Sequence, residues 1–387
     1  MTLSSRRVPA LDGLRGVAVV AVLLHHLSYY LPANGLSGRI QRLFFAGWSG
    51  VDLFFVLSGF LITGILLDAK GAPNYFKAFY ARRVLRIFPL YYAVLTVILL
   101  YAALRPGHWP NALLPIPHDR LFYFLYLNNW WFLLRDTWHA NIIGHFWSLA
   151  VEEQFYMLWP VCVWLLPARR VVAVAVAGIA AALGIRCALY LHFGPVRDIV
   201  ENVFARMDSL FVGVFMAALV RQPEALRRLK PYVFAGAAAS AAVLLVINLA
   251  ARAFIDSEWY VIFAFSLFAW AFGGLVLHTF LTTQEESWLQ RVFSSRPLTT
   301  VGKYSYGMYV YHVPLIALAS ALFATSLDLG RNPVTSVLFA AGVIAATFVV
   351  AKLSFDLFES RFLRLKSRFT FAMEEPAVSL PRGGVTT

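Results

Sequence analysis

Residues 11–26 read LDGLRGVAVVAVLLHH, an apolar run with two charged residues at one end and two histidines at the other. An apolar run of this kind is typical of a helix that crosses a membrane. Asp12 and Arg15 are three residues apart, so they can pair on one face of such a helix. The polar groups need an explanation, because removing them from water is costly.

The same apolar pattern recurs along the whole chain. Of its 387 residues, 60% are hydrophobic and 14% are charged, whereas soluble domains are roughly 25% charged. We therefore expect an all-α polytopic membrane bundle of about ten transmembrane helices, without a soluble domain. The expected helices are 11–31, 44–67, 87–104, 145–166, 171–191, 204–221, 232–250, 259–281, 304–324 and 335–357.

Basic residues predict the orientation of this bundle. If both termini are cytosolic and 121–134 does not cross, most of the 33 Lys and Arg residues lie on the cytosolic side. The stretch 121–134 is therefore predicted to be re-entrant or interfacial. Residues 1–373 are expected to form one membrane domain, whose first helix is retained rather than cleaved as a signal peptide, and 374–387 a disordered cytosolic tail. Cytosolic loops also account for the net charge of +13, so no nucleic-acid partner is expected.

The first helix presents one histidine on the same face as its arginine. Arg15 and His26 are eleven residues apart, which corresponds to about 16 Å of helical rise and an angle within about 20°. His25 points about 100° away from His26, so the two do not easily chelate one metal ion. His26 is then either a packed histidine or a general base.

Further polar residues lie in or beside the other predicted helices. Asp52 has a strongly apolar context and needs a partner, and Gly59 lets helices approach closely. Arg83 and Arg86, with Arg82 beside them, either anchor the topology or bind phosphate, since guanidinium groups bind phosphate with two hydrogen bonds.

The adjacent Glu152 and Glu153 are hard to explain by packing, because they project about 100° apart in a membrane helix. One can pair with Arg or His while the other lines a cavity. A third polar group comprises Tyr306, Tyr309 and His312. Four more ionisable residues are expected to be structural counter-ions: Arg186, Arg206, Asp208 and Lys352.

Taken in order, these motifs resemble those of the acyltransferase 3 family, membrane O-acyltransferases of bacterial surface glycans, nodulation factors and macrolides. The resemblance covers about residues 10–360 and rests on LDGLRGVAVVAVLLHH, GVDLFFVLSGFLI, FYARRVLRIFPLY, WSLAVEEQFY and SYGMYVYH. Arg15 and His26 match the family's Arg-x10-His motif, and Arg83 and Arg86 its Arg-x2-Arg motif. The resemblance implies a multi-pass protein of the bacterial plasma membrane that passes an acyl group from a cytosolic acyl-CoA to a hydroxyl.

The hypothesis that follows makes His26 the general base, supported by Glu152, Glu153 or Asp52 as the acid supports the histidine in a catalytic triad. The co-substrate is acetyl-CoA or another short acyl-CoA, and no metal is expected. The residues expected to contact the donor or its oxyanion are Arg15, Arg83, Arg86, Ser58, Tyr306 and Tyr309, with Trp147 as a further oxyanion donor. Direct transfer in a ternary complex is favoured over an acyl-enzyme.

The acceptor stays open between two classes. In its length, its short loops and the lack of an appended hydrolase-like domain, the chain looks like the macrolide-acylating members of that family. This resemblance implies a macrolide acceptor, and a cell-surface polysaccharide or lipid-linked glycan is the alternative. The rival of another class is a membrane transporter, since polar groups inside a helix bundle also suit a solute path. The sequence shows no inverted repeat. The expected partners are the bilayer and a small-molecule or glycan acceptor, and an oligomer is compatible with the sequence.

Overall fold

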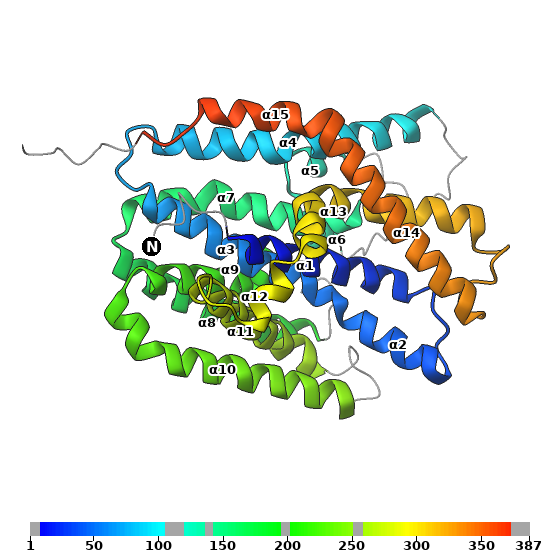
Figure 1. Ribbon diagram of the computed structural model, residues 1–387, viewed down its shortest axis with the longest axis horizontal. Helices are drawn as coiled ribbons and strands as arrows, with labels where there is room; N and C mark the ends of the chain where they lie inside the picture. Colours follow the sequence, from blue (N-terminus) through cyan, green and yellow to red (C-terminus); the bar gives the residue numbers. More distant parts are fainter. Residues whose placement is uncertain (1–7, 105–119, 136–141, 195–201, 251–257, 373–387) are drawn as a thin grey trace, which may run out of the picture.

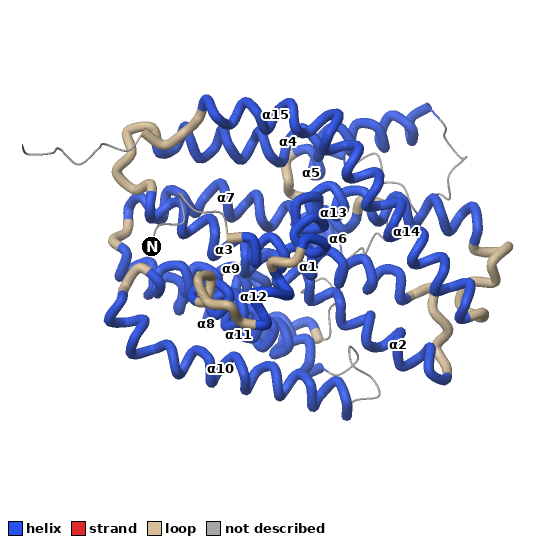
Figure 2. The backbone as a smooth tube through the Cα atoms, in the orientation of Figure 1, coloured by secondary structure: helices blue, strands red, loops and turns tan. Residues whose placement is uncertain are grey.

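The computed structural model describes residues 8–104, 120–135, 142–194, 202–250 and 258–372. Within these ranges the regular structure is helical, without strands (Figures 1 and 2). The predicted all-α bundle is therefore confirmed for the described part of the chain. Most of the long helices run lengthwise across Figure 1, and α1 lies in the middle of the bundle.

Nine helices of the described part are long and apolar enough to cross a membrane. One of them is α3 (Gly50–Asp68), which follows α2 (Gly35–Phe45) and the 3-10 turn Ala46–Ser49 without a break. The other eight are α1 (Pro9–Ser28), α4 (Tyr75–Leu104), α8 (Ala168–Phe193), α9 (Val203–Val220), α10 (Pro223–Ala250), α11 (Glu258–Leu281), α13 (Arg296–Phe323) and α14 (Pro333–Ser354).

The tenth predicted span, 145–166, corresponds to α7 (Trp147–Leu165), which follows the 3-10 turn Gly144–Phe146. This 19-residue helix is not among the nine, although its length suits a membrane. Glu152, Glu153 and Gln154 stand together in it and lower its hydropathy. One face of it packs against α3, while apolar side chains such as Leu158 and Trp164 on another face are exposed.

The segment 121–134 is broken into two short helices, α5 (Arg120–Phe124) and α6 (Asn128–Arg135). Between them Tyr126 has a φ of 54°, a conformation that cannot continue a right-handed helix. The Tyr91 ring of α4 stacks on Tyr126 with centroids 4.3 Å apart. Neither piece is long enough to span a bilayer, in agreement with the prediction that this segment does not cross as a helix.

Two close helix crossings hold the centre of the bundle. At the crossing of α3 and α9, a Cβ on Gly59 would collide with the backbone carbonyl of Leu210. A Cβ on Gly213 would collide with the carbonyl of Val56. Small residues therefore let these two backbones touch, as expected for Gly59 from the sequence. The α1 and α13 helices cross in the same way.

The last predicted helix, 335–357, extends further than expected. After α14 the chain passes through a π-helical turn (Phe355–Glu359) into α15 (Ser360–Arg364), the 3-10 turn Leu365–Arg368 (η7), and on to residue 372. We call residues 355–372 the C-terminal strap. It lies beside α4 along one edge of the molecule, where α15 contacts α4 (Figure 1). The predicted disordered tail, 374–387, lies outside the described residues.

Candidate active site

Three arginines from two helices meet near one end of the bundle, and we call Arg15, Arg83 and Arg86 the arginine cluster. Arg83 and Arg86 lie on α4, which begins at Tyr75 rather than at the predicted residue 87. Each is close enough to Arg15 to be repelled by it. Asp12 accepts a hydrogen bond from Arg15 at 3.1 Å, as the sequence predicts. Such a gathering of like charges favours a bound anion.

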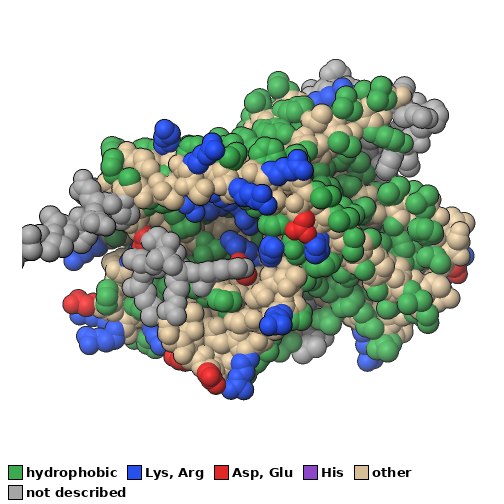
Figure 3. Space-filling model, turned by 45° about the horizontal axis from the view of Figure 1, so that its top comes forward, with side chains coloured by type: hydrophobic (Ala, Val, Ile, Leu, Met, Phe, Trp, Pro, Cys, Tyr) green, Lys and Arg blue, Asp and Glu red, His purple; other side chains and the backbone are tan. Residues whose placement is uncertain are grey.

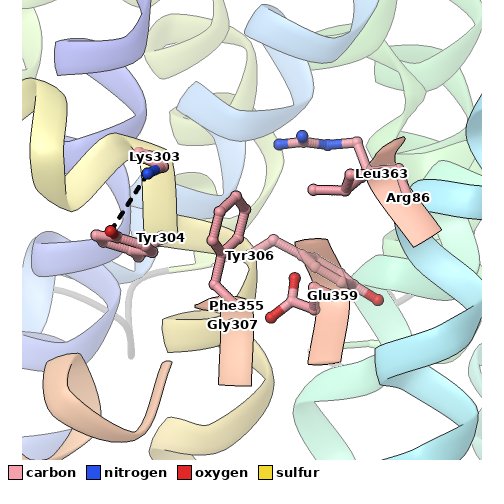
Figure 4. Close-up of a pocket in the computed structure, with 8 residues that line it drawn as sticks. All are labelled: Arg86, Lys303, Tyr304, Tyr306, Gly307, Phe355, Glu359 and Leu363. Carbon is pink, nitrogen blue, oxygen red and sulfur yellow. Dashed lines mark hydrogen bonds between the residues drawn. The ribbon is translucent and has the colours of Figure 1, made fainter. Parts of the chain in front are cut away.

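Basic side chains extend beyond these three. Figure 3 turns the α4 and α15 edge forward and shows Lys and Arg side chains along this edge and around the hollow below it. A small pocket lies here, shown in Figure 4. It is lined by Arg86, Lys303, Tyr304, Tyr306, Gly307, Phe355, Glu359 and Leu363. The Glu359 carboxylate accepts a hydrogen bond from Ser354 at 3.2 Å and attracts Arg86.

Tyr306 therefore lies on the side of the arginine cluster. Its hydroxyl donates to the backbone oxygen of Ile87 at 2.7 Å, which fixes α13 against α4. This position suits contact with the donor better than contact with an oxyanion at His26. Tyr309, one turn further along α13, donates instead to the backbone oxygen of His145 at 3.0 Å and touches the Ser148 hydroxyl.

The two glutamates of α7 have different surroundings. Glu152 accepts a hydrogen bond of 2.6 Å from Ser58 on α3, and Tyr156 donates to the same serine at 2.9 Å. Glu153 is buried, and its Oε1 has no hydrogen-bond partner. Arg83 attracts both carboxylates and lies 5.2 Å from the centre of the Tyr156 ring. Ser58 and Glu152 thus lie between the arginine cluster and the middle of α7.

Three imidazoles from three segments of the chain form a second group, which we call the histidine cluster: His26, His145 and His312. The rings of His26 and His312 are 4.9 Å apart, and those of His312 and His145 are 4.7 Å apart. His312 is completely buried and its Nε2 has no partner. The sequence singled out His312 but missed His145, which precedes the glutamate motif by two helical turns and carried no spacing signal of its own.

Backbone hydrogen bonds set the tautomer of His26. Its Nδ1 donates to the carbonyl of Val22 at 3.0 Å, so the neutral ring carries its lone pair on Nε2. His25 turns to the other side, where its Nδ1 meets the Phe45 carbonyl at 2.7 Å and its ring packs on Phe45. Only His26 therefore faces the other imidazoles of the cluster.

A role in supporting His26 would place the Asp52 carboxyl group beside that imidazole. Asp52 instead binds residues of α9. Its Oδ1 accepts hydrogen bonds from Arg206 at 2.8 Å and from Ser209 at 2.7 Å. A second buried pair joins Arg186 to Asp208 at 2.7 Å. The prediction that Asp52 needs a partner is confirmed.

The expected counter-ions are likewise all paired. Besides the two buried pairs, Lys352 forms an exposed ion pair with Asp356 at 2.7 Å. In the described part of the chain, no carboxyl group hydrogen-bonds to His26. Among these same residues, no three His, Cys, Asp or Glu side chains are grouped so that they could hold a metal ion.

The sequence comparisons place these motifs in a known group of proteins. The acyltransferase domain of the acyltransferase 3 family matches residues 8–353. The chain belongs to this family. Both motif pairs, Arg15 with His26 and Arg83 with Arg86, lie within the match, whereas the C-terminal strap begins just after it.

Two relatives illustrate the similarity. The peptidoglycan O-acetyltransferase OatA of Listeria monocytogenes is 28% identical over 376 residues, which are 92% of this chain and 56% of the relative. The O-acetyltransferase OatA of Staphylococcus aureus is 25% identical over 377 residues, which are 92% of this chain and 57% of the relative. The chain thus spans a little over half the length of these curated relatives. No solved structure gives a significant match.

Proposed function

We propose that this chain transfers a short acyl group, acetyl in the simplest case, from acyl-CoA to a hydroxyl of a cell-surface glycan. One observation carries the proposal. The arginine cluster and the histidine cluster lie toward opposite ends of α1, with polar residues of α7 and α13 between them. Arg15 and His26 are separated by about 16 Å of helical rise. An anionic group and a reacting group can thus be bound at the same time, at two levels of the bundle.

This layout suits coenzyme A. Its phosphates match the guanidinium groups of Arg83 and Arg86, which form paired hydrogen bonds with phosphate oxygens. Its pantetheine arm is thin and carries amide groups that need partners in a buried path. The buried Glu153 Oε1 without a partner is an acceptor for such an amide N–H.

The chemistry at His26 follows from its tautomer. Nε2 removes the proton from the acceptor hydroxyl as that oxygen attacks the thioester carbonyl. When the tetrahedral intermediate collapses, the carbon–sulfur bond breaks and the proton passes from the imidazolium to sulfur, which gives free CoA. The Val22 carbonyl holds Nδ1–H throughout, in place of the carboxylate of a catalytic triad. The Tyr309 and Ser148 hydroxyls, next to this cluster, are the oxyanion donors that we favour; each would turn its O–H from the His145 carbonyl to the developing oxyanion.

The relatives support a glycan acceptor rather than the macrolide that the sequence favours. The L. monocytogenes relative is named for peptidoglycan, and no relative reported above is named for a macrolide. The chain length and short loops, on which the macrolide interpretation depends, say nothing about what binds at the histidine cluster. We therefore propose a surface glycan, with macrolide acylation as the candidate to be tested against it.

The test is acetyl-CoA turnover by the purified chain in detergent, with peptidoglycan fragments or macrolides as acceptors. We expect release of CoA that depends on a glycan acceptor and is lost in His26→Ala. Acceptor-dependent turnover with macrolides alone would reverse the choice of acceptor. Solute flux in vesicles without CoA release would instead favour a transporter. A trapped acyl-protein that passes its acyl group to the acceptor would contradict direct transfer.

A further inference from the structure

The C-terminal strap brings one more basic side chain to the arginine cluster. Lys366 lies in η7, in the strap beyond residue 353, where the match to the family ends. It is close enough to Arg86, Arg83, Arg82 and Arg15 to be repelled by all four. The part of the chain that the family match does not include thus borders the proposed donor site.

The strap is held in place over α4. Both α15 and η7 contact α4, and Leu363 of α15 lines the pocket beside Arg86 (Figure 4). The end of the strap is tied to the α3–α4 loop by Asn74. Its Nδ2 donates to the Thr370 carbonyl at 2.7 Å, and its Oδ1 accepts from the Ala372 N–H at 2.9 Å. These contacts fix the position of the backbone that carries Lys366.

The surroundings of Lys366 do not balance its charge. The side chain is half-buried, and within the described residues it makes no ion pair or hydrogen bond. The neighbouring Arg364 and Arg368 point to solvent and are exposed. Asp12 and Glu359 already act on Arg15 and Arg86, and no carboxylate of the described residues pairs with Lys366 itself, so a bound anion would stabilise a lysine beside four arginines. The nearby Glu359 is already engaged by Ser354 and Arg86.

We propose that Lys366 binds the 3′-phosphate of acyl-CoA and so makes the strap part of the donor site. This inference rests on the acyl-CoA donor proposed above. A phosphate monoester carries a charge of about −1.5 to −2 at neutral pH and offers three acceptor oxygens, which suits a lysine between arginines. The nucleotide end is the part of the donor farthest from the thioester. Arg82, one of the arginines near Lys366, is exposed, so this part of the basic group is open to solvent, where that end would be.

Anionic lipid headgroups carry the same phosphate chemistry and also occur at a membrane surface. Two features favour the nucleotide. Lys366 is half-buried near the arginine cluster, and its segment contributes Phe355, Glu359 and Leu363 to the wall of the pocket that contains Arg86 and Lys303. The experiment separates the two sources of phosphate.

The test compares binding of acetyl-CoA and acetyl-dephospho-CoA, which lacks the 3′-phosphate, to the full chain in lipid-free neutral detergent with 0.15 M salt. We expect Lys366→Ala to weaken acetyl-CoA binding about tenfold, since a hydrogen bond to a charged group is lost. Binding of acetyl-dephospho-CoA should change much less. The control is Arg368→Ala, which removes an exposed positive charge from the same strap and should leave both affinities unchanged. Asn74→Ala, which frees the end of the strap, should reproduce the selective loss in weaker form.

Equal affinities of Lys366→Ala and wild type for acetyl-CoA would overturn the inference, as would equal losses for the two donors. A loss that appears only in bilayers with phosphatidylglycerol, and not in detergent, would assign the lysine to lipid instead. If wild type binds no acetyl-CoA, the proposed donor itself is wrong. If wild type binds it and Arg86→Ala weakens binding while Lys366→Ala does not, only the role of the strap is wrong.

Discussion

The adjacent residues His25 and His26 differ only in what surrounds them. Both hold a backbone carbonyl through Nδ1, but His25 packs on Phe45 while His26 faces His312. Side-chain chemistry alone therefore does not identify the base. The direction of each ring on α1 does.

Replacing these two histidines separately tests the assignment. His26→Ala should lower kcat by about 100-fold or more, because general-base catalysis typically contributes 10²–10⁴-fold. His25→Ala is the matched control and should keep most of the activity. CoA release at saturating acetyl-CoA measures both. Loss of turnover in His25→Ala with a normal His26→Ala would exchange their roles.

The buried Asp52–Arg206 pair gives a prediction about stability rather than catalysis. Asp52→Ala should lower the free energy of unfolding by about 3–5 kcal/mol, because it leaves the Arg206 charge buried and unpaired. Lys352→Ala breaks an exposed pair and should leave stability nearly unchanged. Thermal unfolding in detergent compares the two. If the Asp52→Ala protein had normal stability but no turnover, Asp52 would have a role in catalysis rather than in stability.

Among the elements, the contact of α3 with α9 depends on two glycines that leave no room for a side chain. Gly59→Ala should lower the unfolding temperature, because its Cβ would meet the Leu210 carbonyl and the backbones would have to separate. Gly342→Ala on α14 is the control, since a Cβ there meets nothing within 4 Å. Equal unfolding temperatures for the two variants would mean that the crossing is looser than described.

Helix positions could be predicted from the sequence because an apolar run must be about as long as the bilayer is thick. The same signal failed where helices leave the apolar region. It missed the first turns of α4 from Tyr75 and the strap after Ser354, whose charged residues end the apolar run but not the helix. The helix predicted at 145–166 is present as α7, although its polar residues keep its hydropathy below that of the nine apolar helices.

The candidate site could be predicted in part for a similar reason. Motif spacing within one helix identified Arg15 with His26 and Arg83 with Arg86. Contacts between helices left no such pattern, so neither the Asp52–Arg206 pair, 154 residues apart, nor the approach of His145 to His312 was visible. Lys366 looked like one more cytosolic basic residue until the strap placed it beside α4.

For the whole molecule, the orientation in the membrane remains a prediction from the distribution of Lys and Arg. With Cys162 and Cys187 replaced by Ala, a single cysteine at Ser367 should react with an impermeant maleimide only after cells are opened. A cysteine at Ala33, after α1, should react in intact cells. The reverse pattern would place the arginine cluster outside and exclude a cytosolic acyl-CoA as its ligand.

The Asp52–Arg206 pair also constrains how the protein is made. The two residues are separated by 154 positions, so α3 leaves the ribosome long before α9. At about 5–20 residues per second, the carboxyl group waits roughly 8–30 s for its partner. Asp52 lies in the first turn of α3, and a charged aspartate costs up to about 2.5–3.5 kcal/mol on insertion scales, the value for the centre of a lone membrane helix. During biosynthesis α3 must therefore be sheltered by the insertion machinery, or keep its aspartate protonated, until α9 arrives.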